Sequence, residues 1–426
     1  MTRIFQNGTI YFQGQFQEKD FLIDDLGNIT IADKIDLDEV DEIIDCSGLH
    51  VFPGFIDPHV HLREPGFEYK ETIETGTKAA AKGGYTTVFA MPNVKPAPDS
   101  LEHLQSLTKR FEQNGVVHII PVGSITKEQK GIGELVDFDT CIEETFLFSD
   151  DGKGVQEESM MREAMIQCEK NNAVILAHCE DESLLIPGGS IHASKKAEEF
   201  GLIGISSESE YAQVRRDLKL AKETGCQYHI CHISTKETVE ALRQAKKDGC
   251  NVSGEVTPHH LFLCDEDITE NHGRFKMNPP LRTKEDQEAL LQGLLDGTIE
   301  MISTDQAPHS EEEKNCTFDK AAMGIVGNEI AFPLLYTYLV KEKKCTLKQL
   351  VDWMSTNVAD VFGVEGGEIE NFAKANITIF NLNDRQQVRS REFLSKGKST
   401  PFEGRWLQSK CLMTLVDGDI VYRKGL

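Results

Sequence analysis

The 426-residue sequence lacks both a long apolar run and a signal-like N-terminus. No apolar stretch approaches the roughly 18 residues that cross a bilayer, and the opening MTRIFQNGTIYFQGQF has no basic segment followed by an apolar one. The 11 cysteines include no Cys-x-x-Cys pair, and a chain of this length does not need disulfides to stabilise its core. We therefore expect buried, reduced thiols in a cytoplasmic protein that has no membrane partner.

Positive charge is also scarce, since 45 Lys and Arg residues face 70 Asp and Glu residues and give a formal net charge of −25. A polyanion of this kind repels nucleic acids and anionic membrane surfaces. It also repels anionic small molecules at long range. A carboxylate substrate would therefore need a specific basic residue inside the site.

Both ends of the chain show alternating apolar and polar residues interrupted by Gly and Asp. This period of two is typical of short antiparallel strands, and Asp417-Gly418 between two such runs is a hairpin signal. The pattern does not occur between the two ends. We predict one small β-sandwich domain composed of residues 1–52 and 366–426.

Residues 53–365 alternate short apolar runs with amphipathic, helix-like segments. Eight apolar runs fit the eight parallel strands of a (β/α)8 TIM barrel within the α/β class, and the helix-like segments fit its outer ring. The longest irregular stretch, residues 180–209, is predicted to be a binding loop. The eight runs are LHVFPGFID, YTTVFAM, VVHIIPV, TFLFSD, AVILAH, YHICHI, NVSGEV and IEMIST.

Candidate metal ligands stand where these strands should end, which is where barrels of this kind place their active sites. His59 and His61 close the first run, and residues i and i+2 of an extended chain face the same way. One such pair can arise by chance, and one buried His is often only a core residue. Coincidence at five of eight strand ends is hard to sustain. The other candidates are Asp151 (after Asp150), His178, His232 and Asp305.

Four imidazoles and two carboxylates exceed the needs of one tetrahedral ion but suit two neighbouring divalent ions that share a bridging carboxylate. We predict a binuclear site, with zinc as the metal. Such a centre acidifies water and polarises a carbonyl group, which is the chemistry of amide or ester hydrolysis. Asp305, at the last strand end, is predicted to move the proton, as a base in hydrolysis and as an acid in reverse.

Arg63 follows the His pair directly and supplies the basic residue that the acidic chain requires. Its planar guanidinium group can hold a carboxylate, and Asn93 at the second strand end can add a neutral hydrogen bond. The alternative is a local salt bridge from Arg63 to Glu64 or Glu68. We favour substrate binding because the site otherwise lacks positive side chains.

Long sequence blocks surround these residues and are far more specific than a single His-x-His. They include DPHVHLREPGFEYKETIETGTKAAAKGGYTTVFAMPN, FSDDGKGV, ILAHCED, YHICHISTKE, EVTPHHL, FKMNPPLR, STDQAPH and MGIVGNEIAFPLLYT. Over essentially the whole chain, this set resembles the dihydroorotases of the amidohydrolase superfamily, of the bacterial class I type.

The resemblance implies a role for each candidate residue. His59 and His61 would bind the first metal, Asp151 would bridge, and His178 and His232 would bind the second. Asp305 would be both a ligand of the first metal and the catalytic acid/base. The substrate contacts implied are His61, Arg63, Asn93, Asn278, His309 and the backbone at Met323-Gly324.

The resemblance also implies a reaction and partners. The reaction would be the reversible cyclisation of N-carbamoyl-L-aspartate to (S)-dihydroorotate plus water, the third step of de novo pyrimidine (UMP) biosynthesis. Two Zn2+ or other divalent ions per subunit would be the cofactors. The implied partners are a second copy of the chain, in a homodimer, and aspartate transcarbamoylase.

One residue departs from the family pattern: Gln306 stands where the family usually has His. Because it follows Asp305 on the opposite face of the strand, we expect only an indirect effect on the geometry of that ligand. His259 and His260 match the family and are predicted either to be structural or to support a metal ligand without binding the metal. His229, three residues before His232, is predicted to face the opposite side.

Two alternatives stay open. Other cyclic amidohydrolases, such as allantoinase or hydantoinase, share the barrel and the His pair, but they normally bridge their metals with a carboxylated lysine. Here the fourth strand ends in acids, and the nearest lysine, Lys153, lies beyond Gly152. A non-catalytic barrel that binds a transcarbamoylase is the other alternative. Lost ligands would indicate it, and none is lost.

Overall fold

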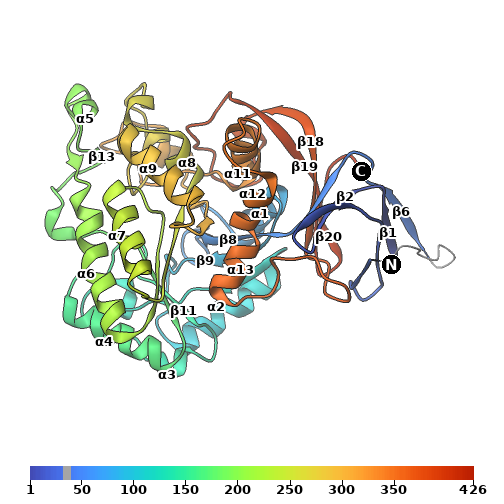
Figure 1. The fold of residues 1–426 in the computed structure, drawn as a ribbon. Coiled ribbons are helices and arrows are strands. Elements are labelled where there is room, and N and C mark those ends of the chain that lie inside the picture. Colours follow the sequence, from blue (N-terminus) through green and yellow to red (C-terminus); the bar gives the residue numbers. More distant parts are fainter. Residues whose placement is uncertain (32–39) are drawn as a thin grey trace.

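The computed structural model describes residues 1–31 and 40–426. Within them, eight short parallel strands follow one another round a barrel (Figure 1). They form two sheets, ordered β10-β9-β8 and β11-β12-β15-β16-β17, which the bridges Gly123–Phe148 and Val60–Gln306 join into a closed ring. The strands are β8 (Phe55–Val60), β9 (Tyr85–Ala90), β10 (His118–Pro121), β11 (Leu147–Phe148), β12 (Val174–Ala177), β15 (Gln227–Ile230), β16 (Val252–Val256) and β17 (Met301–Ile302).

Each predicted apolar run overlaps one barrel strand, and the TIM-barrel prediction is confirmed. The first run, however, divides between two sheets. Its first half is β7 (His50–Pro53), which belongs to the β-sandwich, and Gly54 separates it from β8. A Cβ at Gly54 would lie 2.0 Å from Oγ1 of Thr86, so only glycine lets the chain pass this close to its neighbour.

Amphipathic helices cover the outside of the barrel, as predicted. Their ends carry local stop and start signals. Helix α1 begins after Thr72, whose side chain accepts a hydrogen bond from the Thr75 N–H, and ends at Gly84 with a φ of 94°. The helices of the ring are α1 (Ile73–Gly83), α2 (Leu101–Asn114), α4 (Glu158–Lys170), α6 (Glu208–Thr224), α7 (Lys236–Lys247), α9 (Lys284–Leu295), α11 (Ala331–Leu335), α12 (Leu347–Met354) and α13 (Thr356–Phe362).

The predicted irregular loop at 180–209 contains more regular structure than its sequence suggested. It holds η2 (Glu182–Leu184), β13 (Ile191–His192), α5 (Lys195–Phe200) and β14 (Gly204–Ile205), with β13 and β14 paired in parallel. Two-residue strands are too short to show a period of two, which is why the pattern missed them. Buried Ile191 and Ala197 pack this segment against a hydrophobic core cluster beside the barrel.

Both ends of the chain meet in a β-sandwich at one side of the barrel (Figure 1), which confirms that part of the fold prediction. The predicted turn at Asp417-Gly418 joins its last two strands, with φ values of 50° and 87°. Part of the predicted strand-rich segment, residues 32–39, lies outside the described residues. The boundaries predicted at 53 and 365 stay a prediction. One sheet contains β1 (Arg3–Gln6), β4 (Phe21–Ile23), β5 (Ile29–Ile31) and β6 (Glu42–Asp45), and the other β2 (Thr9–Phe12), β3 (Gln15–Glu18), β7, β18 (Ile377–Gln387), β19 (Trp406–Val416) and β20 (Asp419–Arg423).

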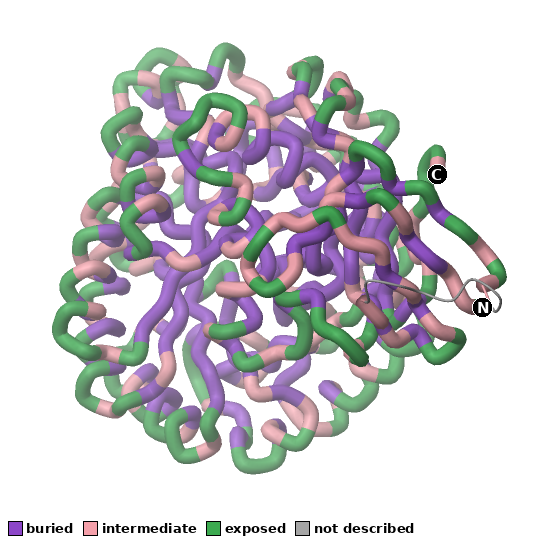
Figure 2. Tube along the Cα trace, turned by 45° about the vertical axis from the view of Figure 1, so that its right-hand side comes forward, coloured by how far each residue is buried: buried purple, intermediate pink, exposed green. Residues whose placement is uncertain are grey.

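An aromatic cluster joins the sandwich to the barrel. Phe52 of β7 and Phe380 of β18 pack on Phe332 of α11, with ring centroids 5.3 and 4.5 Å apart, and Phe55 of β8 stacks on the same ring. Buried residues fill the centre of the molecule (Figure 2). No helix among the described residues is long and apolar enough to cross a membrane.

Candidate functional site

A cavity of about 210 Å3 opens at the carboxyl ends of the barrel strands. Eleven of the twelve predicted site residues line it, and the twelfth, His59, lies directly beneath with no exposed surface. The fold therefore brings together residues that are up to 265 positions apart in the chain. The cavity is lined by His61, Arg63, Asn93, Asp151, Gly152, His178, His232, Asn278, Asp305, Ala307, His309, Met323 and Gly324.

The carboxylate of Asp151 lies at the centre of four imidazole rings. Its Oδ1 atom is 3.4 Å from Nε2 of His59 and 3.6 Å from Nε2 of His232, and its Oδ2 atom is 3.6 Å from Nε2 of His61. Nδ1 of His178 lies 3.7 Å from Oδ1. Among the described residues, two groups with metal-ligand spacing include Asp151, one with His59 and His61 and one with His178 and His232; a third group has His59 with Cys231 and Glu255.

The donor atoms of this cluster fit bound metal ions. Within the described part of the chain, Nε2 of His59, Nδ1 of His61, Nδ1 of His232 and Oδ1 of Asp151 are buried and have no hydrogen-bond partner. Buried polar atoms are normally paired, and imidazole nitrogens and carboxylate oxygens are zinc ligands. The chain thus presents candidate metal-binding groups at the centre of the cavity.

Asp305 faces the same cluster from the end of β17. One of its oxygens, Oδ1, lies 3.1 Å from Nε2 of His61 and 3.6 Å from Nε2 of His59. Burial would raise the pKa of Asp305, but the hydrogen bond from His61 and the positive charges of the His rings hold that pKa at about 2. The carboxylate is therefore ionised at neutral pH and can accept a proton.

Three site residues have left-handed backbone conformations that residues other than glycine seldom adopt: Arg63 (φ 62°), His232 (φ 33°) and Asp305 (φ 47°). Such conformations cost on the order of 1–3 kcal/mol each and cluster at functional sites.

The left-handed backbone at His232 also explains why the prediction for His229 was wrong. His229 does not face away from the site, because Nε2 of its ring lies 3.2 Å from the buried Glu255. The unusual backbone at His232, two residues after the end of β15, breaks the alternation of side chains, and both His residues therefore point into the barrel.

The alternative that Arg63 forms a salt bridge with Glu64 or Glu68 is wrong. Glu64 accepts a hydrogen bond from the Ile73 N–H, and Glu68 accepts one from the Gly66 N–H. Among the described residues no carboxylate lies within 4.0 Å of the guanidinium group, whose Nε–H donates to the Pro308 carbonyl. Arg63 is thus a half-buried cation at the cavity wall, with no carboxylate of the described residues in ion-pair contact.

His309 lies beside Arg63 and is neutral. Burial, together with the charges of Arg63 and Lys70, lowers the pKa of His309 to about 3. Its Nε2–H donates to the Met323 carbonyl over 2.8 Å, and its Nδ1 faces Nζ of Lys70 at 3.2 Å. The next residue, Gly324, has a φ of 137°, and a Cβ there would lie 2.6 Å from the Ala307 carbonyl oxygen. Only glycine fits this wall.

The amide groups of Asn93 and Asn278 point to different neighbours. Nδ2 of Asn93 donates to the carbonyl oxygen of Asp151 over 2.8 Å, and its Oδ1 is buried and unpaired within the described chain. Asn278 donates to the carboxylate of Glu180 over 3.2 Å and lies 3.3 Å from Nε2 of His178. The sequence analysis did not identify Glu180 as a site residue. The available signal was its position two residues after His178 in an extended segment, which places both side chains on the same face.

Two further buried carboxylates below the cluster were also missed. Asp57 accepts hydrogen bonds from the N–H and hydroxyl groups of Thr304, the residue before Asp305. Glu255 contacts the ring of His59. A charged residue inside an apolar strand was the signal for both. By contrast, Asp150 turns away, since it accepts hydrogen bonds from Ile125 and Thr126.

Of His259 and His260, only His260 has both ring nitrogens paired within the described chain. Nδ1 of His260 pairs with Oγ1 of Thr257 at 2.8 Å, and its Nε2 faces the Pro279 carbonyl oxygen at 3.0 Å. Nε2 of His259 is buried and unpaired in the described chain. Gln306 points away from the metal ligands, because its Oε1 accepts hydrogen bonds from the main chain of Gly327 and Asn328.

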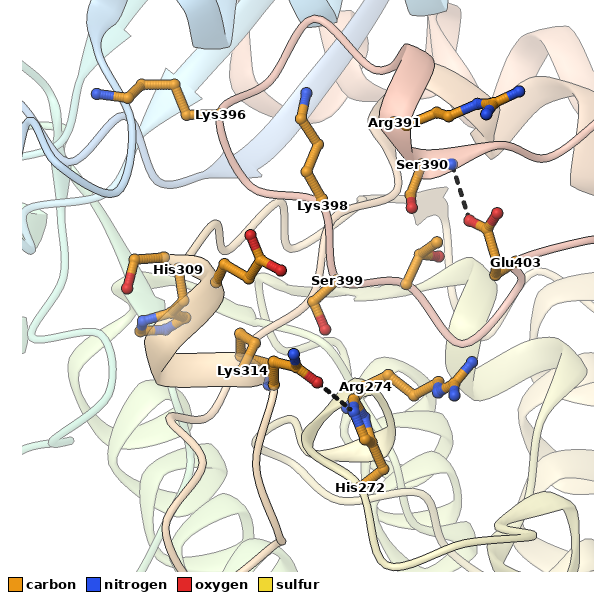
Figure 3. A pocket seen from close by; sticks show the side chains of 14 residues that line it. His272, Arg274, His309, Lys314, Ser390, Arg391, Lys396, Lys398, Ser399 and Glu403 are labelled. Atoms are coloured by element: carbon orange, nitrogen blue, oxygen red, sulfur yellow. Dashed lines mark hydrogen bonds between the residues drawn. The ribbon is translucent and has the colours of Figure 1, made fainter.

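A larger cavity, of about 640 Å3, also has His309 in its lining (Figure 3). It is rich in Lys and Arg, but several of these side chains are already engaged. Lys314 donates to the carbonyl groups of Lys276 and Ala322, and Lys398 donates to those of Phe393 and Ser395. None of the candidate metal ligands is among the described residues that line it.

Comparison with known proteins agrees with this geometry. Residues 48–238 match a family model described as dihydro-orotase-like. The chain is 49% identical to a dihydroorotase from Staphylococcus aureus over 99% of both chains, and 50% identical to one from Anoxybacillus flavithermus over 97% of this chain and 96% of the other. An L-hydantoinase (dihydropyrimidinase) structure from Arthrobacter aurescens shares the fold, with a TM-score of 0.88, 24% identity, and coverage of 100% of this chain and 96% of that one.

The full-length likeness to these dihydroorotases, on a barrel with a cluster of candidate ligands at its strand ends, defines a cyclic amidohydrolase. Within that class, the chain belongs to the dihydroorotase family.

Proposed function

We propose that the protein catalyses the reversible cyclisation of N-carbamoyl-L-aspartate to (S)-dihydroorotate, and that Arg63 is the residue that selects this substrate. The observation that supports Arg63 is its half-buried guanidinium group, which lines the cavity and has no carboxylate within ion-pair distance among the described residues. A free carboxylate of the substrate would provide that partner, with bidentate hydrogen bonds. Hydantoin and dihydrouracil carry no such carboxylate. The likeness to hydantoinases extends to the fold alone.

We infer that the cavity holds two divalent ions, with zinc as the favoured metal. His59 and His61 would hold one, His178 and His232 the other, and Asp151 would bridge them, in line with the two groups that share its carboxylate. When bound, such ions supply Lewis acidity toward a carbonyl oxygen and acidify water. Asp151 needs no modification to bridge, which distinguishes this site from one built on a carboxylated lysine.

The chain's own residues position the substrate and move a proton. Arg63, with Asn93 and His309 nearby, would hold the carboxylate that does not react. In ring closure the ureido nitrogen attacks the side-chain carboxylate, a C–N bond forms, a C–O bond breaks, and the departing oxygen leaves as water with two protons, one of them from the ureido nitrogen. Asp305, in its protonated form, would give its proton to the departing oxygen. In the reverse direction, ionised Asp305 would take a proton from the attacking water.

A non-catalytic role is less well supported, because every predicted ligand is retained and each either lines the cavity or, like His59, lies directly beneath it. We also propose that the protein acts in the cytoplasm as a homodimer and associates with aspartate transcarbamoylase. The family resemblance is the support for these partners. Light scattering on the purified chain, alone and mixed with the transcarbamoylase, would test both.

The direct test of the substrate is a steady-state assay of ring opening. The metal-loaded protein should hydrolyse L-dihydroorotate and should not hydrolyse dihydrouracil at a comparable rate, since dihydrouracil lacks the carboxylate for Arg63. Efficient turnover of dihydrouracil with none of dihydroorotate would move the chain to the hydantoinase branch.

A further inference from the structure

Glu255, on the inner face of β16, is a buried carboxylate that the reaction outlined above does not use. It has no exposed surface. Its Oε1 atom lies 3.0 Å from Nδ1 of His59 and accepts a hydrogen bond from the main-chain N–H of His232 over 3.2 Å. Its Oε2 atom lies 3.2 Å from Nε2 of His229. One carboxylate therefore contacts a candidate ligand of each proposed metal ion.

We propose that Glu255 is a positioning residue that determines which ring nitrogen His59 presents to the metal site. The inference rests on the proposed role of His59 as a metal ligand. An ionised carboxylate can only accept hydrogen bonds, so His59 carries its proton on Nδ1. The lone pair of Nε2 then points toward Oδ1 of Asp151, 3.4 Å away. That nitrogen is buried and otherwise unpaired within the described chain.

The same carboxylate also supports the unusual backbone at His232. The φ of 33° at this residue aims its ring into the cavity, and the hydrogen bond from its N–H to Glu255 helps to keep it there. The negative charge acts as well, because a carboxylate paired with a ligating imidazole raises the basicity of that imidazole. Glu255 thus orients one ligand through its ring and another through its main chain.

If Glu255 had only a structural role, any side chain of the same shape could replace it, provided that both of its polar end groups were hydrogen-bonded. Glutamine has the same shape, and its amide oxygen could still accept from Nδ1–H of His59. Its amide NH2 could face His229, whose Nδ1 has a second partner in Oγ of Ser253 at 2.7 Å. Glu255→Gln should therefore fold, and should lose mainly the negative charge beneath His59, because its amide can present either the oxygen or the NH2 group to that ring.

The test is the zinc affinity of metal-free protein, measured by competition with a chromogenic chelator. Glu255→Gln should weaken zinc binding about 10- to 100-fold, which is the effect typical of partners of metal-ligating histidines. Glu71→Gln is the matched control. Glu71 is also almost fully buried, but it binds Ser395 and the Lys396 N–H and contacts no candidate ligand. Its zinc affinity should equal that of the wild type.

A spectroscopic readout separates positioning from packing. In a 15N spectrum of the histidine rings of zinc-loaded protein, His59 should carry its proton on Nδ1, with the signal assigned by its loss in His59→Asn. In Glu255→Gln this signal should shift or be lost by exchange with water. An unchanged signal together with wild-type zinc affinity overturns the proposal.

Two further variants keep the outcome decisive. If Glu255→Gln does not fold, Glu255→Asp is assessed in the same way, because it keeps the charge but withdraws the oxygens from His59 by one methylene group. Unchanged zinc affinity in that variant also overturns the proposal.

His59→Ala tests the assignment of His59 as a metal ligand, on which the proposal rests. If it binds zinc as the wild type does, the proposed ligand set fails; if it loses affinity while Glu255→Gln does not, only the role of Glu255 fails.

Discussion

The guanidinium group of Arg63 lies against the imidazole ring of His309, with Nη2 of the first 3.4 Å from Nε2 of the second. The ring is neutral, because burial and the charge of Arg63 itself lower the pKa of His309 to about 3. The Nε2–H of His309 is donated to the Met323 carbonyl. The positive charge of Arg63 is thus held at the cavity wall by neutral groups and remains available to an anionic ligand.

Arg63→Lys should raise the KM for N-carbamoyl-L-aspartate at least tenfold, which corresponds to about 1.4 kcal/mol of binding free energy. An ammonium group cannot reproduce the two parallel hydrogen bonds of a guanidinium group with a carboxylate. The measurement is steady-state kinetics in the direction of ring closure. Arg162→Lys, at an exposed helix pair with Glu158, is the control and should behave as the wild type. Unchanged kinetics in Arg63→Lys would contradict the substrate role.

Asp151→Ala should lose the second metal ion and most turnover, whereas Lys153→Ala should stay active. Asp151 lies between both groups of candidate ligands, and Lys153 is an exposed residue outside the cavity. A carboxylated lysine forms from carbon dioxide, so a site that used one would need bicarbonate on reconstitution. Metal-free protein given zinc in carbon-dioxide-free buffer should regain dihydroorotate hydrolysis. Dependence on bicarbonate, with an inactive Lys153→Ala, would refute the assignment.

Gln306→Ala should destabilise the protein by about 1–3 kcal/mol, because it leaves buried main-chain N–H groups unpaired. Oε1 of Gln306 accepts from the N–H of Gly327 over 2.8 Å and from that of Asn328 over 3.1 Å. Urea unfolding gives the free-energy change, and atomic absorption gives the metal content, which should not change. A loss of metal in the folded variant would show that Gln306 influences the ligands more strongly than its contacts indicate.

Lys314 should make the stability rise with pH above neutrality. Burial, reinforced by the charge of Lys276, lowers the pKa of Lys314 to about 7 in the folded state, from 10.5 ordinarily. Between these two values the unfolded chain binds more protons than the folded one, so the free energy of unfolding increases as pH rises. Lys314→Met should lose this contribution. The free energy of unfolding of the wild type minus that of the variant, from urea unfolding, should be larger at pH 9.5 than at pH 7. The same difference at both pH values would contradict the lowered pKa.

Patterns along the chain predict much of this protein because barrel strands and strand-end ligands are local features. The pair His59 and His61 and the acids after the fourth strand are readable from spacing alone. Contacts made inside the barrel are not. The inward turn of His232 depends on a left-handed backbone that no periodicity indicates, and this is why the orientation of His229 was predicted wrongly. Glu255 and Asp57 acquire their roles only when strands far apart in sequence become neighbours.

The most direct test of a binuclear dihydroorotase is a zinc titration of the metal-free protein, with L-dihydroorotate hydrolysis as the readout. Two groups of candidate ligands that share Asp151 predict that activity rises until about two equivalents of zinc per chain are bound and then levels off. Full activity at a single tightly bound equivalent would contradict the account.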